Sequence, residues 1–151
     1  AGAIGYPQFM PSSYRAYAID FDGSGQSDLN NSMADSIGSV ANYYARHRWK
    51  TGQPVGVPAR LAKGEADKLA TRKLKANKTV ASLTKAGVQA DIDVDSKTPA
   101  ALIKLEGESG PIYRMVFENF FVITRYNTSQ LYAMAIQLLS EGIRQQYMEG
   151  E

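Results

Sequence analysis

Oxygen-bearing side chains recur at alternate positions in one short stretch of the chain. Asp20, Asp22 and Ser24 are followed directly by Gly25. These residue types occupy positions 1, 3, 5 and 6 of an EF-hand loop, where alternate side chains direct oxygens at one calcium ion and glycine makes the sharp turn. Gln26, at position 7, would add a backbone carbonyl. The alternative interpretation is a solvated turn between two helices.

The closing position of this loop departs from the EF-hand pattern. Position 12 should be a bidentate glutamate, and Asn31 stands there. The next strong ligand is Asp35, so the loop must be longer than a standard one if Asp35 closes it. The pattern leaves open whether Asp28 or Asn31 also contributes. We predict a structural Ca²⁺ site formed by Asp20, Asp22, Ser24, Gln26 and Asp35.

No other constellation of reactive side chains stands out. The chain has no cysteine, which excludes disulfides and thiol chemistry. Its single histidine, His47, has no companions for a zinc site or a triad, so a structural role at a helix end is favoured. Glycosidic cleavage would need a carboxylic acid in an apolar pocket. Glu118 has apolar neighbours, but a solvated carboxylate at a strand end is the commoner case.

Hydrophobic periodicity, caps and turn residues predict the elements that position these side chains. We expect helices at residues 14–19, 33–47, 63–74 and 80–85, and a last helix capped by Thr128 or Ser129. We expect strands at residues 55–57, 91–95, 100–105 and 113–117, the last extended by 120–124. The two runs at 100–105 and 113–117 are joined by turn-forming residues and predict a hairpin.

Two of these helices carry predicted buried faces. On the helix at 33–47, Tyr43 lies beside the apolar face and can border a groove. That face consists of Ile37, Val40, Ala41 and Tyr44. The buried stripe predicted on the last helix consists of Leu131, Met134, Ala135, Leu138, Leu139 and Ile143.

These elements predict a mainly helical α+β fold with an EF-hand-like loop and a small antiparallel sheet. With 151 residues and 44% hydrophobic content, the chain can bury one core. We divide it into a core part with the calcium loop at residues 1–75, a small α/β hairpin subdomain at 76–127, and a C-terminal helix at 128–151 that returns to the core.

The charge balance favours neither nucleic acid nor a membrane surface as a partner. Seventeen basic and 15 acidic residues give a net charge of +2. The basic residues cluster between Lys63 and Lys85. We interpret this run as a solvated helix face, with contact to an anionic polymer as the alternative. The sequence contains no signal peptide and no apolar run of membrane-spanning length.

Two blocks of sequence resemble the membrane-bound lytic murein transglycosylase B family. The first comprises AGAIGYPQFMPSSY from Ala1, DFDGSG from Asp20 and DSIGSVANYY from Asp35, and the second is NFFVITRYNTS from Asn119. The resemblance runs from residue 1 to about residue 147, with a weakly diagnostic middle. It implies a lysozyme-like fold and a periplasmic location, with an export signal and possible outer-membrane anchor on a longer precursor.

The resemblance also implies an activity. Enzymes of this family cleave the bond between N-acetylmuramic acid and N-acetylglucosamine in peptidoglycan without water. One glutamate protonates the glycosidic oxygen and then takes a proton from the muramic 6-hydroxyl, which closes a 1,6-anhydro ring. That glutamate belongs to a segment before Ala1, so we expect no catalytic residue here and an inactive chain by itself. The preceding part would be a fragment lost from this chain or a separate polypeptide partner.

The same resemblance implies which residues contact the peptidoglycan strand. Tyrosine rings offer flat apolar faces to sugar C–H groups, and amide side chains can bond N-acetyl groups. From the residues alone, the alternative is that the tyrosines are core aromatics beside a helix start. The predicted substrate-binding residues are Gln8, Phe9, Tyr43, Tyr126, Asn127 and Tyr132.

Three functions remain to be distinguished. The first is the groove-lining part of a lytic murein transglycosylase. The second is a non-catalytic, calcium-stabilised module that binds glycan strands. A calcium switch is the weakest, because only one loop is present and no methionine-rich target groove accompanies it.

Overall fold

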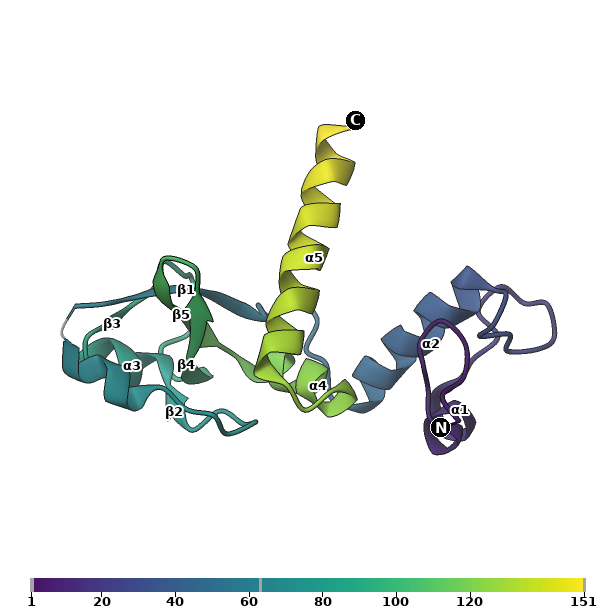
Figure 1. Cartoon of the computed structure of the whole chain (residues 1–151), viewed down its shortest axis with the longest axis horizontal. Coiled ribbons are helices and arrows are strands. Elements are labelled where there is room, and N and C mark those ends of the chain that lie inside the picture. The colour runs from purple at the N-terminus through teal and green to yellow at the C-terminus, as the bar shows by residue number, and fades with distance from the viewer. Residues whose placement is uncertain (1, 63, 151) are drawn as a thin grey trace. The chain divides into compact units, whose positions relative to one another are not determined.

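The structure, a computed structural model, describes residues 2–62 and 64–150 (Figure 1). Ala1, Lys63 and Glu151, where some of the predicted segments begin or end, lie outside the described residues. Contacts divide the chain into two compact units, Ala1–Trp49 and Lys50–Glu151, and each is described by itself. No helix within the described ranges is both long and apolar enough to cross a membrane.

The first unit contains two helices joined by the acidic loop. Helix α1 (Pro11–Tyr17) begins at a proline, whose fixed φ and missing N–H suit the first helical position. No side chain caps it, and the predicted start at residue 14 was wrong, because the helix begins three residues earlier. Helix α2 (Met33–Arg46) is capped by Ser32, and its predicted bounds are confirmed to within one residue.

The buried face of α2 is polar, and the predicted apolar face was wrong. Ile37 is 63% exposed and Ala41 is exposed. The residues that α2 buries are Asp35, Ser36, Gly38, Ser39 and Tyr43. Gly38 lets Phe21 approach closely, since a Cβ there would lie 2.6 Å from its side chain. The side chains that α2 directs toward the preceding loop are therefore those that form hydrogen bonds with the loop backbone.

The second unit is built on a five-stranded antiparallel sheet, with strand order β2-β4-β5-β1-β3 (Figure 1). Its strands are β1 (Gly56–Leu61), β2 (Lys78–Thr79), β3 (Val88–Gln89), β4 (Pro99–Gly107) and β5 (Gly110–Val116). The predicted hairpin is confirmed as β4 and β5, which pair as far as Gly107 opposite Gly110. Gly110 has φ +120, a backbone conformation that favours glycine at this turn.

One face of the sheet packs on a short helix and forms the core. Helix α3 (Val80–Lys85) is confirmed as predicted; Thr79 and Ser82 form its capping box, and Gly87 follows it at φ +94. The helix buries Leu83 against the sheet. The buried core residues of this cluster are Ala66, Leu83, Val88, Ala100, Leu102, Met115 and Phe117.

Two helices complete the unit. Residues 120–124, predicted to extend a strand, lie instead within helix α4 (Glu118–Tyr126), which buries six consecutive residues from Asn119 to Thr124. Ser129 caps helix α5 (Gln130–Glu149), as predicted. Met134 is buried, but Leu131, Leu138, Leu139 and Ile143 are exposed, so most of the predicted stripe on α5 is not buried within the described residues.

Three other predicted segments differ from the structure. The expected helix at 63–74 is replaced by a 3-10 helix, η1 (Gly64–Leu69), and an irregular loop. The expected strand at 55–57 begins at Gly56 and continues to Leu61. Residues 91–95 form no strand, although Ile92 and Val94 pack against the core, because no neighbouring strand pairs with them. The alternation of polar and apolar residues therefore predicted the burial of Ile92 and Val94 correctly, but it predicted the pairing of a strand incorrectly.

Candidate functional site

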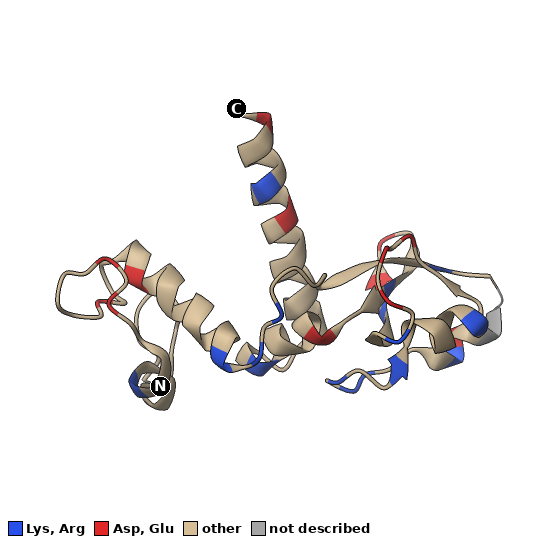
Figure 2. Cartoon of the chain, turned by 180° about the vertical axis from the view of Figure 1, so that it is seen from behind, with Lys and Arg blue, Asp and Glu red and all other residues tan. Residues whose placement is uncertain are grey.

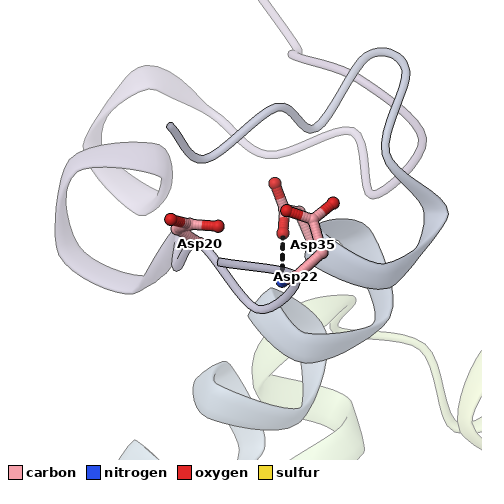
Figure 3. Close-up of side chains that lie close together, drawn as sticks. All are labelled: Asp20, Asp22 and Asp35. Carbon is pink, nitrogen blue, oxygen red and sulfur yellow. Dashed lines mark hydrogen bonds between the residues drawn. The ribbon is translucent and has the colours of Figure 1, made fainter. Parts of the chain in front are cut away.

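Three carboxylates from the first unit converge (Figure 3). Asp20, Asp22 and Asp35 each place one carboxylate oxygen within 4.8 Å of the others. Asp20 and Asp22 come from the exposed loop, whereas Asp35 lies in the first turn of α2 and is fully buried. Residues 15 positions apart in the sequence are thus brought to one place by the loop folding back onto α2.

Backbone amides hold Asp35 in this position. Its Oδ1 accepts from the N–H groups of Phe21 at 2.7 Å and Asp22 at 3.2 Å, and its Oδ2 accepts from the N–H of Asp28 at 2.8 Å. These bonds offset the cost of burying a carboxylate. Figure 3 shows the bond from Asp22. Asp35 thereby fixes the path of the loop at both of its ends.

Asp20 organises the tip of the loop. Its carboxylate accepts from the N–H groups of Gly23 at 2.8 Å, Ser24 at 3.0 Å and Gly25 at 2.8 Å. Both glycines have positive φ, +76 and +94, which other residues rarely adopt. The predicted role of glycine as the turning residue of the loop is consistent with this geometry.

Hydrogen bonds keep the neighbouring carboxyl groups ionised. The Ser32 hydroxyl donates to Asp22 at 2.7 Å, and this bond, followed by those from Ser24, lowers the pKa of Asp22 below its ordinary 3.8. The Asn31 side-chain amide donates to Asp28 at 2.9 Å and is the main cause of the lowered pKa of Asp28. Both carboxylates are negative at neutral pH.

The donor set fits a hard divalent cation. Ser24 Oγ lies 3.2 Å from the carbonyl oxygen of Gln26. These two further oxygens belong to residues that closely follow Asp20 and Asp22 in the sequence. Calcium takes six to eight oxygen ligands at about 2.3–2.6 Å, and oxygens bound to one such ion lie within about 5 Å of one another. The 4.8 Å limit for the three carboxylates satisfies this condition. The side-chain amide of Asn31 is directed to Asp28 instead.

The predicted sugar-binding residues of the first unit differ in exposure. Gln8 is exposed and has φ +54; its side-chain amide donates to the carbonyl of Gly5 at 2.9 Å, which closes a tight turn. Phe9 is 2% exposed and Tyr43 is 8% exposed, with ring centroids 6.0 Å apart. Tyr43 also packs edge-on to Tyr17 at 4.8 Å. Phe9 and Tyr43 are therefore buried against each other, directly after the Gln8 turn in the case of Phe9.

His47 belongs to the same aromatic group. It is the C-cap of α2, where its backbone N–H donates to carbonyls of the last turn, and its ring lies 4.3 Å from that of Tyr43. This position agrees with the predicted structural role at a helix end.

The predicted residues of the second unit gather at one connection. Tyr126 ends α4, Asn127 is its C-cap, and Tyr132 lies in the first turn of α5. Ser129 donates its backbone N–H to the Asn127 carbonyl at 2.8 Å, which tightens the connection. Asn127 is exposed and the two tyrosines are half-buried; burial raises the pKa of Tyr132 above 10.0. Two tyrosines and an exposed amide therefore lie within seven consecutive residues, at the connection between α4 and α5.

Glu118 does not meet the requirements of a catalytic acid. It lies in the first turn of α4, rather than at a strand end, and forms a salt bridge with Lys50. Both side chains are partly exposed. A general acid for glycosidic cleavage needs an apolar pocket, and the ion-paired, solvent-exposed carboxylate of Glu118 does not lie in one.

Sequence reasoning missed one polar cluster of the second unit. The hydroxyl of Tyr113 donates to Asp67 at 2.7 Å, and Lys104 Nζ lies 3.1 Å from the same carboxylate. The Tyr113 hydrogen bond is the largest cause of the lowered pKa of Asp67, ahead of Lys104. Asp67 is separated from its partners by 37 and 46 positions, so no local pattern could have indicated the contact.

Comparison with known proteins identifies the family of this arrangement. The family model described as "Transglycosylase SLT domain" matches residues 1–141. The chain belongs to the transglycosylase SLT domain family. The resemblance inferred from the sequence blocks is thereby confirmed, and the fold of mixed helices and antiparallel strands matches solved transglycosylases of this kind.

Relatives of this SLT-domain chain are longer proteins. Membrane-bound lytic murein transglycosylase B of Escherichia coli is 41% identical over 143 residues, which cover 95% of this chain and 38% of the relative. Soluble lytic transglycosylase SltB1 of Pseudomonas aeruginosa matches with a TM-score of 0.90 and 39% identity over 97% of this chain and 48% of that one.

A third relative was solved with a metal. The Escherichia coli lytic transglycosylase Slt35 in complex with calcium matches with a TM-score of 0.83 and 40% identity, covering 95% of this chain and 45% of its own. The SLT-domain chain thus spans less than half the length of each of these relatives.

Proposed function

We propose that this chain forms the groove-lining part of a lytic murein transglycosylase. The observation that carries the proposal is the 41% identity, over 95% of the chain, to a lytic murein transglycosylase. The enzyme would cleave the β-1,4 bond between N-acetylmuramic acid and N-acetylglucosamine of peptidoglycan. The match of the fold to solved lytic transglycosylases supports the same conclusion.

A glutamate in sequence preceding residue 1 would act as the acid. It donates its proton to the glycosidic oxygen as the C1–O4 bond breaks, and the N-acetylglucosamine hydroxyl leaves. The resulting carboxylate takes the proton of the muramic 6-hydroxyl, and that oxygen bonds to C1 to close the 1,6-anhydro ring. One proton is given and one is recovered, so no water is consumed. The preceding segment would belong to the same polypeptide or to an associated one.

This chain would bind and orient the sugars. The half-buried Tyr126 and Tyr132 would lie against pyranose C–H groups, and the exposed Asn127 would bond an N-acetyl group. In the first unit, the exposed Gln8 would make the polar contact, and Phe9 and Tyr43 would hold its turn in place. Groups whose positions are set by packing lose little entropy when substrate binds.

We also propose that the acidic loop is an EF-hand-like Ca²⁺ site with a structural role. Its ligands would be Asp20, Asp22, Ser24, Gln26 and Asp35, supported by the convergence of the three carboxylates within 4.8 Å. A relative solved in complex with calcium gives independent support. Bound calcium would neutralise like charges that otherwise repel, and so would hold the loop on α2.

The activity implies a periplasmic location, because peptidoglycan lies there. A membrane anchor would lie outside this chain, and the relative named membrane-bound makes an outer-membrane anchor a specific expectation.

A second candidate is a non-catalytic, calcium-stabilised module that binds peptidoglycan. The observation favouring it is that Glu118, the acid candidate with the most apolar neighbours, is ion-paired with Lys50. In this case the same tyrosines and amides would bind glycan strands without cleaving them.

Digestion of purified murein in H₂¹⁸O distinguishes the candidates. The protein should first be weighed intact under denaturing conditions, because a mass above 16.5 kDa or a second polypeptide would reveal the acid-bearing part. A transglycosylase releases 1,6-anhydro-muropeptides with no ¹⁸O. Products with ¹⁸O at a reducing end would overturn the proposal in favour of hydrolysis. If the acid-bearing part is present, binding without release would favour the module.

A further inference from the structure

The loop between η1 and β2 is an exposed cationic segment. Together with Lys78, the first residue of β2, it carries four basic residues, and no acidic residue occurs from Lys68 to Ala90. Figure 2 shows blue but no red along this loop. Among the described residues, no salt bridge is recorded for these four side chains, and all are exposed. We call residues 71–78 the cationic loop; its basic residues are Arg72, Lys73, Lys75 and Lys78.

The cationic loop is fixed at both ends. Thr71 donates its N–H to the Leu102 carbonyl at 2.8 Å, and Asn77 donates to the Ala100 carbonyl at 3.3 Å. Both acceptors lie on β4, at the core of the unit. A segment anchored in this way presents its charges in a limited region, so binding costs less ordering entropy than binding by a free tail would.

A side chain of α5 ties the cationic loop to the predicted sugar-binding residues. Gln130 donates from its amide to the carbonyls of Thr71, at 3.1 Å, and Lys73, at 3.4 Å. Gln130 is the first residue of α5, three positions after Asn127 and two before Tyr132. The positive charges therefore border the α4–α5 connection, although they lie more than 50 positions away in sequence.

We propose that the cationic loop binds the carboxylates of murein peptide stems beside the sugar-binding connection. This inference rests on the proposed function. N-acetylglucosamine is neutral, and the lactyl carboxyl of N-acetylmuramic acid is consumed in the amide to the peptide. The fixed negative charges of the polymer therefore lie on its peptides, which extend from the sugars that Tyr126 and Tyr132 would hold. Lysine and arginine side chains pair with such carboxylates.

The composition of the loop favours a peptide over insertion into a membrane interface. A loop that inserts into an interface needs apolar side chains facing outward. The one large apolar residue among the four cations is Leu74, and it is half-buried. Binding of an acidic peptide needs only the positive charges of the loop.

Binding measurements with two murein preparations test the proposal. The full chain is sedimented with intact murein and with glycan strands stripped of peptides by an amidase. We expect Lys73→Glu combined with Lys75→Glu to weaken binding to intact murein by about tenfold at low salt, because each exposed pair contributes a fraction of a kcal/mol and two are reversed. Binding to stripped glycan should stay unchanged. The difference in binding to intact murein between the variant and the wild type should disappear in about 1 M salt, where the Debye length is about 3 Å.

A matched control reverses two charges elsewhere. Lys85 ends α3 beside β3, at the sheet edge opposite β2, and Arg144 lies about 21 Å along α5 from Gln130. Lys85→Glu combined with Arg144→Glu should bind both preparations like the wild type. Gln130→Ala should reproduce part of the loss on intact murein, since it frees the loop and leaves its charges in place. Thermal melts confirm that each variant is folded.

Other outcomes overturn the inference. Equal loss on both preparations would assign the loop to the sugars, and no loss on intact murein would remove it from binding altogether; either leaves the proposed function standing. Lysine-dependent binding to phosphatidylglycerol vesicles but not to intact murein would make the loop a membrane contact. Wild-type chain that binds neither murein preparation would overturn the proposed function and this inference together.

Discussion

The side chain of Asn119 is bonded at both of its ends to the segment around Lys50. Its Oδ1 accepts from the Lys50 N–H at 2.8 Å, and its Nδ2 donates to the Lys50 carbonyl at 2.9 Å. A third bond, also 2.9 Å, runs from Nδ2 to the carbonyl of Gln53. Asn119 is fully buried, and all three of its hydrogen-bond partners belong to the protein. Through this one amide, α4 is attached to the segment that precedes β1.

Replacing Asn119 should destabilise the second unit. Asn119→Ala leaves part-buried backbone groups of Lys50 and Gln53 without their partner, and such a group costs about 1–3 kcal/mol when it is cut off from water. We expect the free energy of unfolding to fall by about 2–4 kcal/mol, measured by urea denaturation. Asn77→Ala is the matched control, because Asn77 is exposed and makes its recorded bond through the backbone. A midpoint for Asn119→Ala equal to that of the control would contradict this account.

Calcium should stabilise the first unit through the acidic loop. A ligand that binds only the folded state at about 100 times its Kd adds about 2.7 kcal/mol, so Tm should rise on adding CaCl₂. Asp20→Ala should lower Tm in calcium and reduce this rise, and Asp22→Asn, which retains the side-chain shape, should reduce it as well. Asp95→Asn, outside the loop, should respond like the wild type. An Asp20→Ala protein with the full calcium response would exclude the assignment.

The cluster of Asp67, Tyr113 and Lys104 should make stability depend on pH in a defined direction. The pKa of Asp67 is lowered in the folded state, so its contribution is present above the ordinary value of 3.8 and is lost as pH falls through the lowered pKa. The pKa of Tyr113 is raised, so its contribution holds below 10.0 and is lost as pH rises through the raised pKa. Both contributions are therefore present at neutral pH.

Asp67→Asn tests this direction. We expect a lower urea midpoint than that of the wild type at pH 7, with the difference shrinking below about pH 4 as the wild-type carboxylate is protonated. Asp93→Asn, an exposed residue of the same unit, serves as the control. A difference that grows on acidification would show that Asp67 is not stabilised as an anion.

Asn127 should contribute to sugar binding and little to stability. Its side chain is exposed, and its recorded bonds at the end of α4 are made by its backbone. Loss of one hydrogen bond to a ligand costs about 0.5–1.5 kcal/mol, so Asn127→Ala should bind peptide-free glycan strands up to about tenfold more weakly, with an unchanged Tm. Isothermal titration with short glycan strands measures the change. A lowered Tm with unchanged affinity would assign Asn127 to the fold.

The elements that the sequence predicts well are those whose determinants are local. The helix Val80–Lys85 has its capping box and following glycine within eight positions, and the β4–β5 hairpin has its turn residues between two apolar runs. The Ser129 cap lies next to its helix. The spacing of Asp20, Asp22 and Ser24 is a local signal of the same kind, and its interpretation as a calcium loop stays a prediction.

Elements that depend on a partner were predicted poorly. The apolar run at 120–124 suits a strand or a buried helix equally, and burial among the other elements of the unit decided for a helix. Residues 91–95 alternate as a strand would, yet found no neighbour to pair with. The buried face of α2 was predicted incorrectly because its buried serines and Asp35 form hydrogen bonds with the loop. The periodicity of apolar residues carries no information about such polar contacts.

By itself, the sequence determined the family, and it predicted the ligands of the acidic loop and the sugar-binding residues, because these depend on residue identity and short spacing. The tertiary structure alone decided that Asp35 reaches Asp20 and Asp22, that Phe9 is buried against Tyr43, and that the cationic loop borders the α4–α5 connection. Each of these contacts joins segments that are separate in sequence. Such contacts form only when a folded chain satisfies its buried polar groups and packs its apolar ones, and local pattern carries no record of them.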